Sequence, residues 1–440
     1  MKRHLLSVLF LLLLTATAGR AEELKHADQP PLRLTLRCAR PDARYRCGET
    51  VAFELVARRG GQPVDIKCQY DLRYCARSRR IIEAGEVEVK NGRAVIEAAL
   101  DQPGFLLCRA WTADCKIANE STAGAAVEPE KIVASTPEAP DFDRFWQDGL
   151  KRQAACPPVE LEKLDAYSTD SYTSYLVKVP AIDGTVIYGF LTEPNAPGKY
   201  PAVVQLPGAG PGYCDPNTEW AARGVIALRM NVHAYRPAGS AEAIKKQYQE
   251  TYGTKLNYLR QNTTDPEKHV YRRAHLAISR AIDFVAARPN FDGRHFVAYG
   301  SSQGGTLGMA MAALNRHLTA VAALVPGFGD HAGYLSGRSN SHLLTPHEDD
   351  PEKLALAQRT AGYFDSALFA RRIRIPVLMS AGYIDATCTP ASVYAIYNQI
   401  AAPKRMIDSV RGPHAVLPEV KAEMMRFLFE HLEYGNKAEK

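Results

Sequence analysis

A serine flanked by glycines is the residue of this sequence best suited to nucleophilic chemistry. Gly300-Ser301-Ser302-Gln303-Gly304 fits the pattern G-x-S-x-G, directly after the apolar run 296–299 and before a stretch compatible with a helix. In that context a sharp strand-to-helix turn lifts the middle serine above the edge of a sheet, and small glycines allow the turn. We predict that Ser302 is a nucleophile for acyl transfer. The alternative is a glycine-rich turn that serves only packing.

A base and an acid must accompany this serine, because a hydroxyl becomes nucleophilic only when an oriented imidazole takes its proton. Downstream, the apolar run 377–380 leads to Asp385, and the run 406–410 is followed by His414. Both residues lie just past predicted strand ends, in the chain order serine, acid, histidine that G-x-S-x-G hydrolases use. We predict Asp385 as the acid and His414 as the base. The rival acid Asp365 fits better as a helix N-cap.

Acyl transfer also requires N–H donors for the oxyanion. The backbone N–H of Gln303, directly after the nucleophile, is the first candidate. The second is expected in the turn after the apolar run 202–206, where Ala209 is the best choice; a plain turn is the alternative. The spacing of cysteines and histidines predicts no metal site, and no motif predicts a cofactor.

The elements that must position these residues are apolar runs separated by amphipathic stretches. Residues 269–288, for example, place their apolar side chains on one helical face. This alternation predicts a mostly parallel sheet covered by helices on both sides. Residues 236–268 and 331–365 are predicted to be long irregular insertions, the usual material of lids. The apolar runs lie at 202–206, 225–230, 296–299, 321–325, 377–380 and 406–410.

The N-terminal region has a different pattern. Residues 30–130 contain short predicted strands without a helical period, and Asn91-Gly92 is a strong hairpin signal. This pattern predicts a small immunoglobulin-like β-sandwich, which either binds glycan or orients the rest of the chain. Residues 117–140 are predicted to be a linker.

The first residues predict export. Lys2 and Arg3 precede an apolar run over 5–18 that ends in small residues, so residues 1–21 are predicted to be a secretory signal peptide; an uncleaved anchor is the alternative. An oxidising compartment predicts disulfides among six clustered cysteines. We also hypothesise a disulfide between Cys214 and Cys388, with two separate thiols as the alternative. The six are Cys38, Cys47, Cys68, Cys75, Cys108 and Cys115.

Composition narrows the classes of partner. The chain has 440 residues and a formal charge of +6, part of which belongs to the predicted signal peptide. Because no long block of like charges occurs, we expect no nucleic-acid partner. We also expect no membrane span in the exported chain. The oligomeric state stays open.

An ordered set of motifs over residues 138–436 resembles the acetyl xylan esterase / cephalosporin C deacetylase family. The resemblance implies an α/β-hydrolase fold and removal of acetyl groups from carbohydrate hydroxyls. It places the family's catalytic triad on Ser302, Asp385 and His414. The motifs include Asp141-Phe142-Asp143-x-Phe145-Trp146, Ile187-Tyr188-Gly189-Phe190-Leu191, Gly300-Ser301-Ser302-Gln303-Gly304-Gly305, Tyr363-Phe364-Asp365 and Gly382-x-x-Asp385-x-x-Cys388-x-Pro390.

The chain departs from the family near the pocket. Pro207-Gly208-Ala209 replaces a His-Gly-Tyr segment, Val232-His233-Ala234-Tyr235 replaces an Arg-Gly-Gln segment, and Ala415 follows His414 where the family has Glu. The expected function is a secreted or periplasmic serine esterase that acts on an acylated carbohydrate or other small ester, through a catalytic domain at 138–436. The alternatives are a serine peptidase of the prolyl-oligopeptidase type and a catalytically silent glycan-binding protein.

Overall fold

The computed structural model describes residues 30–75, 80–112, 120–253 and 257–433. The predicted signal peptide at 1–21 and Cys115 lie outside these ranges. Within them, no helix combines the length and the apolar character needed to cross a bilayer.

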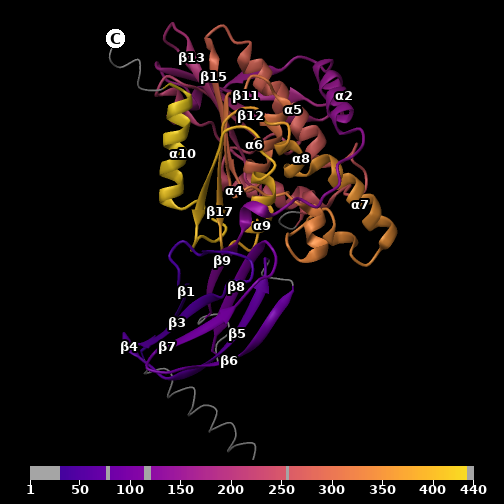
Figure 1. Ribbon diagram of the computed structural model, residues 1–440. Helices are drawn as coiled ribbons and strands as arrows, with labels where there is room; N and C mark the ends of the chain where they lie inside the picture. The colour runs from indigo at the N-terminus through magenta and orange to yellow at the C-terminus, as the bar shows by residue number, and fades with distance from the viewer. Residues whose placement is uncertain (1–29, 76–79, 113–119, 254–256, 434–440) are drawn as a thin grey trace, which may run out of the picture.

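Two packed sheets form the N-terminal part of the molecule (Figure 1). Alternate residues of their strands, such as Phe53 and Leu55, are fully buried between the sheets. Asn91 and Gly92 have φ of 50° and 72°, as a two-residue turn requires, but the strands that this turn connects continue into different sheets. One sheet contains β1 (Leu32–Cys38), β3 (Val51–Arg59), β4 (Gln62–Pro63) and β7 (Arg93–Ala98); the other has the order β2 (Arg44–Tyr45), β9 (Ser121–Val127), β8 (Gly104–Trp111), β5 (Ile66–Tyr74) and β6 (Ile81–Val89).

This architecture confirms the predicted β-sandwich, but the linker prediction is wrong for β9. Residues of β9 pair with β8 on one side and with β2 on the other. The sequence Ser-Thr-Ala-Gly-Ala-Ala-Val shows no alternation of apolar and polar residues and few residues that favour strands. Pairing with neighbouring strands, which the local sequence does not reveal, determines its conformation.

A mixed sheet forms the second part. Neighbours from β14 to β18 run parallel, whereas β10, β11, β12 and β14 pair antiparallel. The parallel strands β13 and β16 are almost entirely buried, as expected for strands that are covered on both faces. The order is β10 (Glu160–Lys163), β11 (Tyr172–Pro180), β12 (Val186–Pro194), β14 (Ile226–Met230), β13 (Tyr200–Leu206), β15 (Phe291–Ser301), β16 (Ala320–Leu324), β17 (Val377–Gly382) and β18 (Lys404–Ser409).

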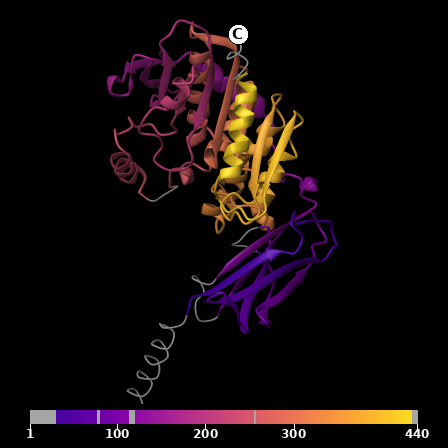
Figure 2. The ribbon, with the colours of Figure 1, turned by 90° about the vertical axis from the view of Figure 1, so that its left-hand side faces the viewer.

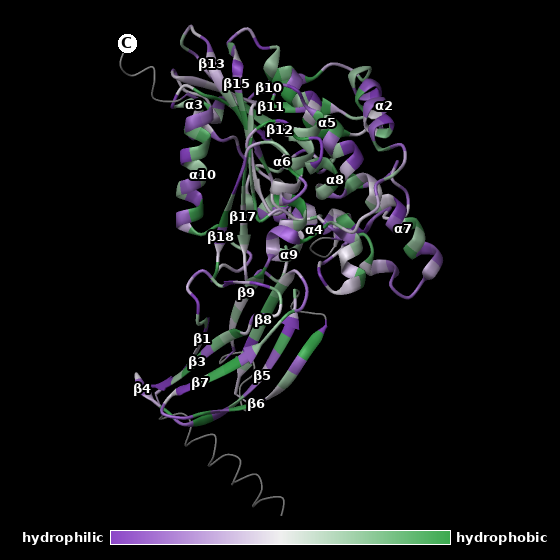
Figure 3. Cartoon of the chain, viewed as in Figure 1, coloured by the Kyte–Doolittle hydropathy of each residue, from purple (hydrophilic) through white to green (hydrophobic). Residues whose placement is uncertain are grey.

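Helices cover both faces of this sheet. Figure 2 shows α10 (Pro418–His431) in front of one face, on which α3 (Thr218–Ala221) also packs. Figure 3 shows hydrophilic and hydrophobic residues interleaved along α10, because Val420, Met424 and Phe427 point to the sheet. This is the predicted α/β-hydrolase arrangement. The other face carries α2 (Phe142–Ala154), α5 (Val270–Ala286), α6 (Gln303–Leu314), α8 (Ser366–Ala370) and α9 (Pro390–Tyr397).

The two predicted irregular insertions contain helices, and this corrects the sequence interpretation. Residues 236–268 include α4 (Ala241–Tyr252) and the 3-10 helix η3 (Asn257–Arg260). Residues 331–365 include η4 (His331–Ser336), η5 (Thr345–His347) and α7 (Pro351–Phe364). Helix α7 begins with a side-chain cap, since Asp350 accepts a hydrogen bond from the N–H of Lys353, and Pro351 occupies its first position.

Candidate active site

Ser302 lies at the turn between β15 and α6. Its φ of 57° and ψ of −121° are strained values for a residue with a side chain. The N–H of Ser302 donates to the carbonyl of Leu324 on β16 at 2.9 Å, which holds the turn against the sheet. Gly300 is required here, because a Cβ at this position would lie 2.6 Å from the carbonyl carbon of Gly304. The predicted strand-turn-helix context of the serine is therefore present.

The structure brings the three predicted residues Ser302, His414 and Asp385 together. His414 Nε2 lies 3.0 Å from Ser302 Oγ, and His414 Nδ1 lies 2.7 Å from Asp385 Oδ2. Because a carboxylate accepts only, Nδ1 carries the proton and Nε2 is free to accept from the serine hydroxyl. The side chain of Asp385 is fully buried, whereas that of His414 is 28% exposed. An imidazole with this geometry can take a proton from the serine and later deliver it to a leaving group.

The loop after β17 holds the carboxylate of Asp385 in place. Its Oδ1 accepts the N–H groups of Thr387 at 2.7 Å and Cys388 at 2.9 Å, which leaves Oδ2 for His414. The rival acid Asp365 instead caps α8, since it accepts the N–H of Ala367 at 2.8 Å. Asp365 is thus an N-cap, as the sequence predicted.

Two backbone amides are available for an oxyanion. Gln303 is the first residue of α6, where an N–H has no partner within the helix. Ala209 lies in the turn that follows β13, and its N–H donates to no other group among the described residues. Whether both amides face one carbonyl oxygen stays a prediction.

Side chains whose role here the sequence did not predict hold this turn. Gln303 Nε2 donates to the carbonyls of Pro207 and Gly208, both at 3.2 Å. The amide oxygen of Gln303 in turn accepts from Tyr271 Oη at 3.0 Å and from the hydroxyl of Tyr258. The position of Tyr271 in the helical stretch 269–288 was the available signal, whereas nothing marked Tyr258.

His233 fixes the far end of the same turn. Its Nε2 lies 2.6 Å from the carbonyl oxygen of Gly210, so this nitrogen donates. Burial lowers the pKa of His233 to about 4, and the ring therefore stays neutral near pH 7. The available sequence signal was the replacement of the family segment at 232–235. The ring is packed among Tyr235, Tyr248, Tyr252 and Tyr258.

The sandwich packs directly on the loop that carries Asp385. Gly124 of β9 approaches the backbone of Tyr383 so closely that a Cβ would lie 2.5 Å from the Tyr383 carbonyl oxygen. The ring of Phe105 stands edge-on to Tyr383, with centroids 5.1 Å apart. Arg44 Nη1 binds Asp408 Oδ2 at 2.9 Å and the hydroxyl of Tyr394 at 3.0 Å. The N-terminal region therefore packs against the loop that carries Asp385.

The prediction of disulfides is wrong for those cysteines whose side chains are free thiols in the structure. Cys214 and Cys388 are not bonded to each other. Cys388 is buried with its sulfur against Gly327 and beside Ser302, turned away from solvent. Burial raises the pKa of the Cys388 thiol, so it stays protonated and does not compete with the serine. Free thiols are Cys38, Cys47, Cys75, Cys108, Cys156, Cys214 and Cys388.

The side chains that could bind a metal ion are those of His, Cys, Asp and Glu. In the described ranges, no group of three or more of these residues has a geometry that could hold a metal ion.

Comparisons with known proteins agree with this geometry. The chain matches the acetyl xylan esterase (AXE1) family over residues 130–431. It is 32% identical to acetyl esterase Axe7A of Xylanibacter ruminicola over 435 residues, which cover 97% of this chain and 96% of that protein. An acetyl xylan esterase from Paenibacillus sp. R4 superposes with a TM-score of 0.58 and 25% identity, over 69% of this chain and 98% of that chain. Acetyl xylan esterase 1 from Thermoanaerobacterium sp. JW/SL YS485 superposes with a TM-score of 0.58 and 22% identity, over 70% of this chain and 98% of that chain.

These matches confirm the resemblance found in the sequence and the α/β-hydrolase fold. They favour an ester hydrolase over the peptidase and the silent glycan-binding protein. Because the match to Axe7A covers 97% of the chain, it includes the sandwich, whereas the two solved structures cover about 70% of it. The chain belongs to the acetyl xylan esterase (AXE1) family and is a carboxylic-ester hydrolase.

Proposed function

We propose that this protein is a secreted serine esterase that removes acetyl groups from carbohydrate hydroxyls, with Ser302, His414 and Asp385 as its catalytic residues. The observation that carries the proposal is the hydrogen-bonded series from Ser302 Oγ through the His414 ring to Asp385 Oδ2, with distances of 3.0 and 2.7 Å. Such a series activates a serine for acyl transfer.

The first half of the reaction forms an acetyl-enzyme. His414 Nε2 takes the proton of Ser302 while Oγ attacks the carbonyl carbon of the acetyl group. The negative charge that develops on the carbonyl oxygen is received by the N–H groups of Gln303 and Ala209. When the tetrahedral intermediate collapses, the bond to the sugar oxygen breaks, and His414 gives its proton to that oxygen.

Water completes the cycle. His414 takes a proton from a water molecule, the resulting hydroxide attacks the acetyl carbonyl, and collapse returns the proton to Ser302 Oγ and releases acetate. Asp385 stabilises the imidazolium in both halves, and its buried carboxylate keeps the ring in one tautomer. Ser302, His414 and one water molecule supply every proton that is transferred in the cycle.

Support for an acetyl group and a carbohydrate alcohol comes from the relatives, which are an acetyl esterase and an acetyl xylan esterase. Support for secretion comes from the sequence at residues 1–21, with its basic start and apolar run.

Replacement of the proposed nucleophile tests the mechanism. We expect Ser302→Ala to lower kcat for p-nitrophenyl acetate and for acetate release from acetylated xylan by about 10³-fold or more, with an unchanged melting temperature. Ser301→Ala is the matched control, since it removes a neighbouring hydroxyl, and should keep activity within about threefold. A Ser302→Ala variant that turns over either ester at the wild-type rate would falsify the assignment.

A further inference from the structure

The outer face of the sandwich sheet that contains β5 and β8 is hollowed. Successive residues of a strand point to opposite faces, so Phe105, Arg109 and Trp111 of β8 share one face. Phe105 packs on Tyr383 at the catalytic part, whereas Arg109 and Trp111 line a cavity of about 710 Å³. From Phe105 to Trp111 the strand rises about 20 Å, at ~3.3 Å per residue. This cavity therefore lies on the face of the sandwich that contacts the loop of Asp385.

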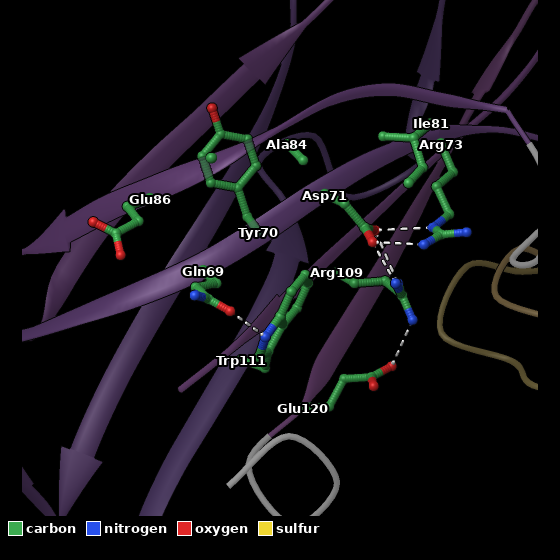
Figure 4. Close-up of a pocket in the computed structure, with 11 residues that line it drawn as sticks. Gln69, Tyr70, Asp71, Arg73, Ile81, Ala84, Glu86, Arg109, Trp111 and Glu120 are labelled. Carbon is green, nitrogen blue, oxygen red and sulfur yellow. Dashed lines mark hydrogen bonds and ion pairs between the residues drawn. The ribbon is translucent and has the colours of Figure 1, made fainter. Parts of the chain in front are cut away.

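The side chains of this cavity are held in fixed positions. Trp111 pairs across the strands with Gln69, and its Nε1 donates to Gln69 Oε1 at 2.8 Å. Figure 4 shows Arg73 and Arg109 converging on Asp71, which is buried and accepts from Arg73 Nη2 at 2.8 Å and from Arg109 Nε at 2.9 Å. Groups fixed in this way lose little conformational entropy when a ligand binds.

The charges of the lining argue against a polyanion. The acids Asp71, Glu86 and Glu120 line the cavity together with the bases Arg73 and Arg109, so the lining carries no excess of positive charge. A nucleic acid or another polyphosphate requires such an excess.

The chemistry instead matches a sugar. A pyranose presents an apolar C–H face, which packs on an indole ring, and a rim of hydroxyls, which pair with planar carboxylate, amide and guanidinium groups. Trp111 supplies the ring, with the planar groups of Gln69 and Arg109 beside it, while the buried Asp71 holds Arg109 in place.

We propose that this sandwich groove, lined by Gln69, Asp71, Arg73, Glu86, Arg109 and Trp111, binds a neutral stretch of the polysaccharide whose acetyl groups the enzyme removes. The inference rests on the proposed function, because it takes the substrate to be a carbohydrate. The groove and the contact of the sandwich with the Asp385 loop share one face, so a bound chain is held on the side of the sandwich that adjoins the active site. A small ester bound at Ser302 does not extend to the groove, so its binding gains no affinity from the groove.

The test compares polymer and small ester in the full-length protein. We expect Trp111→Ala and Gln69→Ala to raise KM for acetylated xylan by about fivefold or more, while kcat/KM for p-nitrophenyl acetate stays within about twofold of wild type. Migration in a native gel that contains deacetylated xylan should be retarded for wild type and less retarded for Trp111→Ala. Tyr167→Ala, which removes a partly exposed aromatic side chain outside the groove, is the control and should match wild type.

Other results separate the two proposals. If wild type releases acetate from the polymer but neither KM nor gel retardation depends on Trp111, the groove is wrong and the proposed function stands. If wild type releases no acetate from polymers yet shows Trp111-dependent retardation, the groove binds a polysaccharide that is not the substrate, and the proposed substrate is wrong for both proposals. If both groove variants lose activity equally on polymer and small ester, the role of these residues is structural, and the groove proposal is overturned.

Discussion

His233 holds the carbonyl of Gly210 at 2.6 Å, and this contact fixes the end of the turn that carries Ala209. The side chain of Gln303 holds the start of the same turn through Pro207 and Gly208. Both contacts come from groups whose own positions are set by buried tyrosines. The turn is therefore organised before any ester binds, which is the condition under which amide donors are most effective for an oxyanion.

His233→Phe tests this organisation. Phenylalanine keeps a ring among the tyrosines but donates no hydrogen bond to Gly210, so we expect kcat for p-nitrophenyl acetate to fall about tenfold with a smaller change in KM. Because burial lowers the pKa of His233 to about 4, its ring is neutral from pH 6 to 9, and the deficit should be constant over that range. His317→Phe on the surface is the control. An unchanged kcat in His233→Phe would remove His233 from the positioning of the turn.

The meeting of Ser302, Asp385 and His414 could be predicted because each follows a recognisable apolar strand, and parallel strands end at one edge of a sheet. His233 and Tyr258 could not be predicted in the same way. Their roles depend on contacts between the turn after β13 and the segments around α4, which are set by tertiary packing and leave no local pattern.

Helix α5 likewise shows that a local sequence pattern predicts an element but not its tertiary contacts. Its apolar period over 269–288 predicted the helix, which spans Val270–Ala286. The period did not reveal that His275 is completely buried, stacked on Tyr271 and packed near Trp146. Strand β9 and helix α7 were missed for opposite reasons: β9 has no periodic pattern, whereas α7 has a clear start at Asp350 and Pro351 inside an otherwise polar segment.

His275 makes the stability of the protein depend on pH. Burial lowers its pKa to about 3, whereas an imidazole in an unfolded chain titrates near 6.5. Between these values the unfolded chain binds one more proton, so stability is lost as the pH falls below about 6.5 and is unaffected by this group above it. At pH 5 the loss from His275 is ~2 kcal/mol, at about 1.4 kcal/mol per pH unit.

His275→Phe should remove this loss. Neither ring nitrogen of His275 has a hydrogen-bond partner among the described residues, so phenylalanine gives up no bond. We measure the free energy of unfolding in urea and subtract the wild-type value from that of the variant. We expect this difference to be ~2 kcal/mol larger at pH 5 than at pH 8, because the variant does not lose this stability in acid. Ser279→Ala, another buried position of α5, should change stability equally at both pH values. Equal differences at pH 5 and pH 8 for His275→Phe would contradict the account.

At the scale of the whole molecule, the sandwich and the catalytic part share a packed core. Phe105 is 1% exposed and lies between Tyr383 and Tyr394, while Arg44 links the sandwich to Asp408 on β18. The sequence predicted both parts but not their contact, because the residues involved are distant in the chain and Gly124, which lies against the backbone of Tyr383, belongs to the stretch predicted as a linker.

Phe105→Ala should therefore affect catalysis as well as stability. Loss of the ring leaves a cavity behind Tyr383, two positions before Asp385, and should lower the free energy of unfolding by ~3 kcal/mol. With the loop less constrained, we expect kcat for p-nitrophenyl acetate to fall about fivefold at a temperature where the variant is folded. Phe53→Ala is the matched control, since Phe53 is fully buried within the sandwich: it should cost similar stability but leave kcat unchanged. Equal kcat values in the two variants would show that the sandwich does not brace the acid loop.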